Sequence, residues 1–270
     1  MQLQEIKELA KKIRRTSIQL VYKARTSHIG GALSQADILA VLYSGIMNIS
    51  PQKINDPNRD RLIESKGHCC VSNYAVLALK GFIDYDDLTN NFCKNGTLYF
   101  EHISHKLPGI EVSTGSLGHG LPIACGMALS AKLANNKSFD IYCIIGDGEI
   151  NEGSNWEAFM FAAHHKLDNL CVILDKNKMQ ALGNTEDILD LDPIAAKLIA
   201  FKWNVIEIDG HNIEQLINAF NTFKKHTGTP TIIIANTIKG KGVSIMENNL
   251  KFHYSPPNDD EMKIAMEELK

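Results

Sequence analysis

A carboxylate and an amide each follow a short apolar run, and together they could hold a metal ion. Asp147 lies in a Gly-Asp-Gly turn after the run 141–145, and Asn177 follows the β-branched run 169–175. Between these two runs, residues 155–167 carry apolar side chains at helical spacing, so the whole segment is predicted to be one βαβ unit. A right-handed crossover makes the strands parallel. We therefore expect both side chains at the carboxyl edge of one sheet.

These groups suit a hard divalent cation beside a diphosphate. Mg²⁺ usually takes one or two oxygens from protein, with phosphate oxygens and water completing its shell. Asp147 and Asn177 supply such oxygens, and the backbone carbonyl of Met179 could supply a third. Gly146 and Gly148 let a diphosphate approach the backbone, and the next helix offers free N–H groups. We predict a metal and diphosphate site for Mg²⁺, with Ca²⁺ and Mn²⁺ as alternatives.

The Gly-Asp-Gly turn has two other interpretations. In isolation such a turn is more often a plain strand-to-helix connection. A calcium-binding loop is excluded, because its sixth position would be Glu152 where glycine is needed and its twelfth Ala158 where glutamate is needed.

Four motifs in order resemble one enzyme family. GDG followed by asparagine resembles the thiamine diphosphate (TPP) signature, and GDGEINEGSNWEA is similar to the version of the transketolase family. SKGH at 65–68, STGSLGHG at 113–120 and TIKGKG at 237–242 also resemble that family. The resemblance covers nearly the whole chain. It implies an α/β fold, namely a three-layer TPP-binding domain of the diphosphate-binding type, with a parallel sheet, helices on both faces and residues 1–270 as one domain.

The resemblance also implies roles for particular residues. Diphosphate or cofactor contacts are expected from His68, Gly115, Leu117, Gly146, Gly148, Asn177 and His253. Family active-site histidines match His28, His68, His102 and His253, and histidine suits the proton transfers of this chemistry. Glu152 and Glu157 match acidic residues between the two active sites of the family's dimer, although Glu157 could simply begin a helix.

Two lysines of the TIKGKG motif have an open role. Lys239 and Lys241 could neutralise phosphate, but solvation at the surface explains their presence equally well.

Two positions depart from the family. The family commonly has Gly-His where this chain has Glu101-His102, and often has glycine where this chain has Tyr254. We therefore expect the backbone and the substrate pocket near His102 to differ.

The resemblance implies a reaction and a partner. A two-carbon ketol unit would pass from a ketose phosphate to an aldose phosphate, with TPP carrying it. The chain ends at Lys270, where the family continues into a second domain that holds the aminopyrimidine. We expect the N-terminal subunit of a two-chain transketolase, completed by a separate C-terminal subunit with the pyrimidine-binding and C-terminal domains, as a two-fold heterotetramer.

Other functions stay open at this point. The chain could serve another TPP enzyme, such as a 2-oxo acid dehydrogenase or a deoxyxylulose phosphate synthase, or act on an unusual sugar. A non-catalytic paralogue is a third possibility. A nicotinamide dehydrogenase is disfavoured, because no GxGxxG follows the first predicted strand.

Composition sets broader bounds. The 270 residues are 44% hydrophobic with a net charge of −3, so a large core is expected and no nucleic-acid partner is indicated. Six cysteines show no CxxC spacing, and no stretch of about eighteen apolar residues exists, which predicts a cytoplasmic protein without a membrane partner.

Periodicity predicts the elements that must position these residues. Helices are expected at Gln2–Arg25, Gln35–Met47, Tyr74–Leu79, Asp84–Phe92, Leu121–Ala134, Asn155–Leu167, Asp190–Phe201 and Ile213–Phe223. Strands are expected at Asp60–Ser65, Ile141–Ile145, Asn169–Asp175, Asn204–Asp209 and Thr231–Asn236. The four histidines fall in predicted loops.

Overall fold

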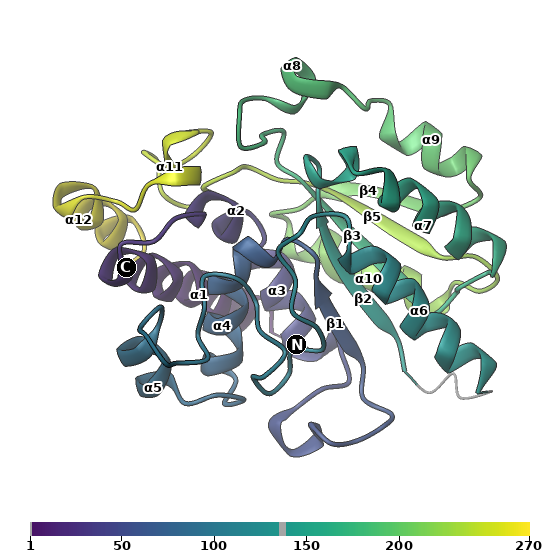
Figure 1. The fold of residues 1–270 in the computed structure, drawn as a ribbon, viewed down its shortest axis with the longest axis horizontal. Helices are drawn as coiled ribbons and strands as arrows, with labels where there is room; N and C mark the ends of the chain where they lie inside the picture. The colour runs from purple at the N-terminus through teal and green to yellow at the C-terminus, as the bar shows by residue number, and fades with distance from the viewer. Residues whose placement is uncertain (1, 135–138) are drawn as a thin grey trace.

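One parallel sheet lies at the centre of the computed structural model, which describes residues 2–134 and 139–270 (Figure 1). Its strand order is β1-β2-β3-β5-β4, and every neighbouring pair runs parallel. The strands are β1 Arg61–Glu64, β2 Ile141–Gly146, β3 Leu170–Lys176, β4 Asn204–Asp209 and β5 Thr231–Asn236. The predicted α/β class with a parallel sheet is confirmed.

Both faces of the sheet are covered by helices, because its central strands are apolar on both sides. Tyr142 and Ile144 of β2 pack into one core cluster, while Ile141, Cys143 and Ile145 pack into another. The first cluster holds α1 Leu3–Ala24, α2 Ile29–Ser34, α3 Ala36–Val41, α4 Cys70–Leu79 and α10 Ile213–Lys225; the second holds α6 Gly120–Leu133, α7 Gly153–His164 and α9 Ile194–Ala200. The result is three layers.

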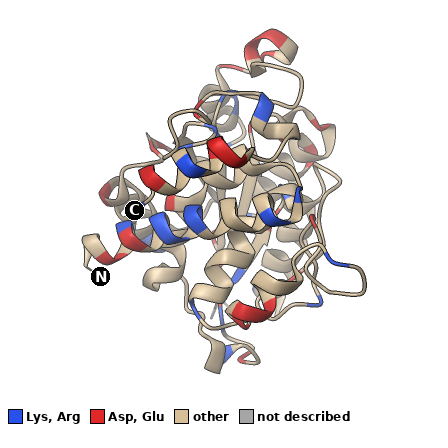
Figure 2. Cartoon of the chain, turned by 90° about the vertical axis from the view of Figure 1, so that its left-hand side faces the viewer, with Lys and Arg blue, Asp and Glu red and all other residues tan. Residues whose placement is uncertain are grey.

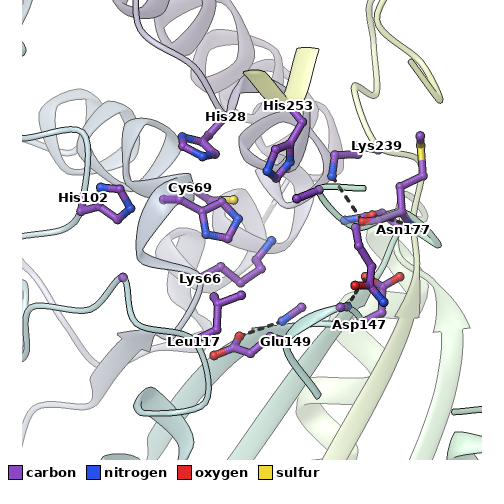
Figure 3. Close-up of a pocket in the computed structure, with 18 residues that line it drawn as sticks. His28, Lys66, Cys69, His102, Leu117, Asp147, Glu149, Asn177, Lys239 and His253 are labelled. Carbon is purple, nitrogen blue, oxygen red and sulfur yellow. Dashed lines mark hydrogen bonds between the residues drawn. The ribbon is translucent and has the colours of Figure 1, made fainter. Parts of the chain in front are cut away.

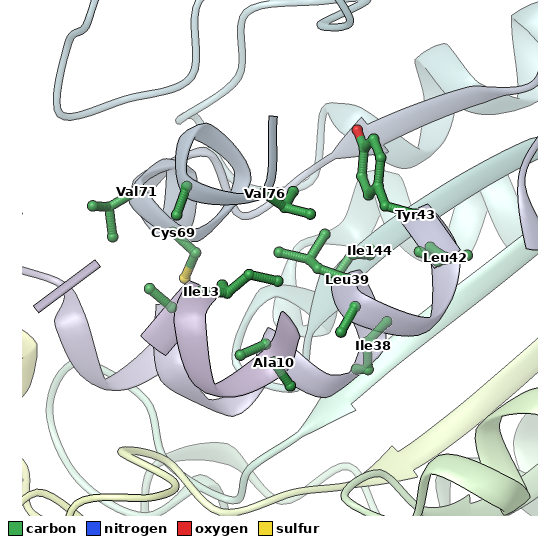
Figure 4. Packing of buried hydrophobic residues seen from close by; sticks show 14 of the residues in the cluster. Ala10, Ile13, Ile38, Leu39, Leu42, Tyr43, Cys69, Val71, Val76 and Ile144 are labelled. Atoms are coloured by element: carbon green, nitrogen blue, oxygen red, sulfur yellow. The ribbon is translucent and has the colours of Figure 1, made fainter. Parts of the chain in front are cut away.

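The first cluster holds the helices from the N-terminal part of the chain against the sheet. Figure 4 shows Ile13 of α1, Leu39 of α3 and Val76 of α4 meeting above the sheet, where Ile144 of β2 also lies. All four side chains are at most 1% exposed. Truncating Ile13, Leu39 or Ile144 to alanine is expected to cost about 2–5 kcal/mol, so this layer supports the site firmly.

Smaller elements complete the chain. They are α5 Tyr85–Asn91, α8 Thr185–Leu189, α11 Lys251–Tyr254 and α12 Asp259–Glu268, with 3₁₀ turns at Pro51–Lys53, Gly67–Cys69 and Glu149–Asn151 and a π turn at Leu42–Ile46. The predicted loops at His68 and His253 are therefore short helical turns. The turn that holds His68 comes shortly after β1, and the one that holds His253 comes after the loop that follows β5.

Several predicted helix boundaries were wrong, and in three segments the cause is clear. The segment after α1 was expected to be a loop, but α2 forms there because Gly30 and Gly31 allow close packing: a Cβ on Gly31 would lie 2.8 Å from Cys69 Sγ. The helix expected to run unbroken to Met47 ends at Val41, and the chain continues as the π turn Leu42–Ile46, in which Gly45 has φ 117°. The helix expected from Asp190 begins only after Pro193, since proline is tolerated at a helix start and not within it.

The outer surface carries mixed charge. Figure 2 shows lysine, arginine and acidic residues interspersed along the helices of the face that it presents. In the part of the chain that the structure describes, no helix combines the length and the apolar character that crossing a membrane requires.

Candidate active site

Asp147 and Asn177 follow adjacent strands and are held by the same turn. β2 and β3 pair so that Gly146 lies opposite Asp175. One Asp147 carboxylate oxygen accepts a hydrogen bond from the Lys178 backbone N–H at 2.5 Å, and Asn177 Oδ1 accepts one from the Met179 N–H at 3.1 Å. Both side chains are 6% exposed. The structure thus brings together the carboxylate and the amide that the sequence singled out.

A cavity of about 280 Å³ opens at this edge (Figure 3). Eleven of the predicted site residues line it: His28, His68, His102, Gly115, Leu117, Gly146, Asp147, Gly148, Asn177, Met179 and His253. Glu152 and Glu157 do not. Glu152 precedes α7, and Glu157 lines a separate hollow between α6 and α7, so both lie on the exposed outer side of these helices.

The oxygen donors at the edge fit a hard divalent cation. Burial, and then the charge of Asp175, raises the pKa of Asp147 to about 7. The ionised form of this carboxyl group is therefore unfavourable here, and a bound cation would stabilise it. Among the described residues no group of three or more His, Cys, Asp or Glu could hold a metal. A single carboxylate with amide and carbonyl oxygens is the donor set that Mg²⁺ accepts when phosphate supplies further ligands.

Two buried lysines give the cavity its positive charge. Lys66 Nζ lies 2.5 Å from Asp175 Oδ2, and the same carboxylate accepts hydrogen bonds from Ser34 and Thr237. Lys239 Nζ donates to the Met179 carbonyl oxygen at 3.3 Å, and burial lowers the Lys239 pKa. Both lysines are 3% exposed. An anionic group of diphosphate type would be attracted here.

Glu149 fastens the glycine-rich turns together. Its carboxylate accepts hydrogen bonds from Gly118 N at 2.9 Å, from Gly146 N at 3.1 Å and from the Ser65 hydroxyl. The backbones come so close that a Cβ on Gly67 would lie 2.2 Å from the Thr114 carbonyl oxygen. The three motifs SKGH, STGSLGHG and GDGE are therefore one cradle built from three loops.

The four histidines form a cluster on the other wall of the cavity. The His28 ring centroid lies 5.1 Å from that of His68, 5.9 Å from His102 and 5.0 Å from His253. Burial is the main reason why the pKa values of His68, His102 and His253 are lowered. The pKa of His253 falls to about 4. These three rings are neutral near pH 7 and can each accept or donate a proton.

Sequence reasoning missed several residues at the site. Lys66, Cys69, Glu149, Gln180 and Lys239 line the cavity but are not among the predicted site residues. Lys66 and Glu149 had a signal, since one lies inside SKGH and the other directly after GDG. For Lys239 the sequence left phosphate contact and surface solvation equally open; the structure buries it.

Comparison with known proteins shows one family. The model of the family "Transketolase, thiamine diphosphate binding domain" matches residues 6–269. One of the subunits of apulose-4-phosphate transketolase from Actinobacillus succinogenes is 42% identical over 267 residues, which is 98% of this chain and 96% of that protein. "6-deoxy-6-sulfo-D-fructose transketolase subunit SqwG" from Clostridium sp. is 40% identical, with the same coverage.

Longer relatives match over part of their length. Human transketolase is 39% identical over 254 residues, which is 94% of this chain and 40% of that protein. The crystal structure of transketolase from Campylobacter jejuni superposes with a TM-score of 0.94 at 33% identity, covering 100% of this chain and 43% of that one.

Proposed function

The chain belongs to the transketolase family, and we propose that it is the TPP-binding, N-terminal subunit of a two-chain transketolase. The main support is the cavity at the carboxyl edge of the sheet. Asp147, Asn177 and Met179 line it together with two buried lysines and four histidines. An oxygen donor set beside a cationic, glycine-lined cradle is what a metal-bound diphosphate needs.

In this proposal each wall of the cavity has one task. Asp147, Asn177 and Met179 hold Mg²⁺, and Gly146 and Gly148 let the diphosphate reach the backbone. Lys66 and Lys239 oppose its negative charge. When bound, TPP supplies the carbon nucleophile that takes up a two-carbon ketol unit.

The histidine wall handles protons. His68 and His253 lie with centroids 6.0 Å apart between the lysines and the remaining histidines, so they suit contact with the diphosphate side. His28 and His102 lie farther along the cavity and suit the hydroxyl and carbonyl oxygens of the sugar. In its uncharged form an imidazole there can take a proton when a hydroxyl becomes a carbonyl and return it in the reverse half-reaction.

A second subunit completes the proposed enzyme. Two relatives that are named as subunits match this chain over 96% of their length, whereas the single-chain relatives extend well beyond it. We assign the partner the pyrimidine-binding and C-terminal domains, and the assembly two-fold symmetry as a heterotetramer. Residues 1–270 then act as one TPP-binding domain.

Glu152 and Glu157 belong to that assembly in the proposal. They lie outside the cavity on the exposed side of α7, where Glu157 lines a hollow together with an apolar patch of Pro122, Ala158 and Phe161. A partner surface that covers α6 and α7 would bury this apolar patch and bring the two carboxylates into a shared interior.

The substrate class follows from the relatives and from charge. Two of them are named for apulose 4-phosphate and 6-deoxy-6-sulfo-fructose, which both carry an anionic group. We propose a ketose donor and an aldose acceptor with a phosphate or a comparable anion. All six cysteines are free and five are buried, which suits the reducing cytoplasm.

Reconstitution tests the proposal. The purified chain, a candidate C-terminal subunit, TPP and Mg²⁺ should together transfer a ketol unit between sugar phosphates, and neither chain should do so alone. Ketol transfer by this chain without a partner would contradict the two-chain assignment. Turnover of pyruvate in place of a ketose phosphate would contradict the reaction class.

A further inference from the structure

Glu101, Ser27 and His28 are linked by hydrogen bonds at the edge of the cavity. Glu101 Oε1 accepts a hydrogen bond from the Ser27 backbone N–H at 2.8 Å and from the Ser27 hydroxyl at 2.6 Å. Ser27 Oγ also lies 2.9 Å from His28 Nδ1. The Glu101 side chain is 35% exposed and that of His28 is 21% exposed. Two segments far apart in sequence thus meet beside a cavity histidine.

The number of available protons fixes the direction of these hydrogen bonds. The hydrogen bond with His28, and then those from Ser27, lower the pKa of Glu101 to about 2, so the carboxylate only accepts. A serine hydroxyl has one proton, and the 2.6 Å contact with a carboxylate uses it. The contact between Ser27 Oγ and His28 must then be filled by a proton on Nδ1.

The backbone holds the His28 ring in this place. His28 has φ 63°, in the left-handed region that non-glycine residues rarely adopt. Its backbone N–H donates to the His253 carbonyl oxygen at 2.9 Å, which ties the segment to a second wall of the cavity. No described residue forms a hydrogen bond with His28 Nε2, and the ring lines the cavity.

From this geometry, and resting on the proposed function, we propose that Glu101 is a positioning residue. Through Ser27 it holds the uncharged form of the His28 ring as the Nδ1–H tautomer, which leaves an unprotonated Nε2 at the cavity. Glu101 itself touches no reacting atom.

The tautomer decides what His28 can do. An unprotonated Nε2 accepts the proton of a substrate hydroxyl as that oxygen becomes a carbonyl: the O–H bond breaks, an N–H bond forms and the ring becomes imidazolium. The nearby Glu101 carboxylate, 3.4 Å from Nδ1, stabilises that positive charge. In the acceptor half-reaction the same proton returns to the aldehyde oxygen. The other tautomer presents Nε2–H and cannot take the proton.

Nitrogen-15 NMR of the histidine-labelled full chain tests the tautomer without any enzyme assay. The His28 signals are identified from their loss in His28→Gln, and each variant is first checked for an unchanged melting temperature. We expect Nδ1–H in the natural chain and in Glu101→Gln, whose amide oxygen still accepts from Ser27. In Glu101→Ala the Ser27 hydroxyl is released to donate to Nδ1, so the tautomer should reverse. The double variant Ser27→Ala/Glu101→Ala should lose that reversal.

Kinetics of the reconstituted enzyme give the second readout. Glu101→Ala should lower kcat about 100-fold with the Kd for TPP unchanged, and Glu101→Gln should restore most of it. Glu214→Ala on the exposed face of α10 is the matched control and should change neither. An Nε2–H tautomer in the natural chain, or an unchanged tautomer in Glu101→Ala, would overturn the proposal. Absence of ketol transfer by every reconstituted mixture would instead contradict the proposed function, and the NMR result would stand.

Discussion

The Lys66 ammonium lies 2.5 Å from the Asp175 carboxylate, and the two side chains are 3% and 0% exposed. The charge of Lys66 keeps the pKa of Asp175 below its usual value against the effect of burial. Lys66 therefore has two roles: it neutralises a buried carboxylate beside the proposed metal site, and it adds positive charge to the cavity. A single charge in both roles makes the stability of the fold depend on a residue of the site.

Lys66→Met should consequently destabilise the chain as well as weaken TPP binding. Removing one partner of a buried pair leaves an uncompensated charge and typically costs about 3–5 kcal/mol. Lys176→Met is a matched control at the carboxyl edge of the same sheet, at the end of β3, because its partner Asp192 is 54% exposed and such pairs contribute about 1 kcal/mol or less. Urea unfolding at pH 7 measures both, and equal losses in the two variants would contradict this assignment.

Glu64 should make stability depend on pH. Its side chain is 2% exposed and accepts hydrogen bonds from Gln35 and Asn73, and burial raises its pKa from 4.5 to about 8. A carboxyl with a raised folded pKa contributes stability that is complete below pH 4.5 and is lost as pH rises through 8.

Glu64→Gln keeps the shape and removes the titration. Between about pH 5 and pH 8 the free energy of unfolding of the natural chain should fall relative to that of the variant, by at most about 1.4 kcal/mol per pH unit. Urea unfolding across this range checks the slope, with Glu214→Gln as the control. A constant difference over the whole range would show that Glu64 stays ionised.

Gly67→Ala should open the cradle. A Cβ there would lie 2.2 Å from the Thr114 carbonyl oxygen, which is backbone and cannot turn aside. The two loops must separate, at a cost of about 1–3 kcal/mol and with loss of TPP affinity. Gly126→Ala within α6 meets nothing within 4 Å and should stabilise the isolated chain by about 0.5–1 kcal/mol. Thermal unfolding of the two variants should therefore move in opposite directions.

His211 should act on the cofactor through Lys239. His211 Nε2 accepts a hydrogen bond from the Ile238 backbone N–H at 2.9 Å, and its Nδ1 lies 2.8 Å from Asp37, which also pairs with Arg14. His211→Ala leaves the Ile238 N–H without this acceptor, so the loop that carries Lys239 should loosen.

We expect the Kd for TPP to rise about ten-fold in His211→Ala. In the double variant His211→Ala/Lys239→Met, the loss of binding free energy should be smaller than the sum of the losses in the two single variants. His226→Ala, whose ring bonds Thr229 away from the cavity, is the control and should bind TPP normally. Fully additive effects in the double variant would mean that His211 does not work through Lys239.

The sheet and its carboxyl edge could be predicted from sequence because strong local signals coincide there. β5 has the predicted bounds Thr231–Asn236, since an unbroken β-branched run leaves few alternatives. α12 could also have been found: Asn258 and Glu261 form a capping box, a recognisable pattern at a helix start.

Other features depend on the tertiary fold. Gly30 and Gly31 resemble a loop in sequence, yet they lie in α2 because their missing side chains admit Lys239 and Cys69. The contact between Ser27 and Glu101 joins segments 74 residues apart, and neither residue type predicts the other. Such contacts are decided by how the layers pack, which no local pattern encodes.

Metal-dependent cofactor binding tests most directly whether Asp147 and Asn177 hold a divalent cation against the diphosphate of TPP. Calorimetry should titrate TPP into the chain with its partner subunit, with Mg²⁺ and then with a chelator. We predict tight binding with Mg²⁺, a loss of about 100-fold or more in chelator, and the same loss with Mg²⁺ present in Asp147→Ala and in Asn177→Ala. Equal affinity with and without the metal would contradict this assignment of the two residues.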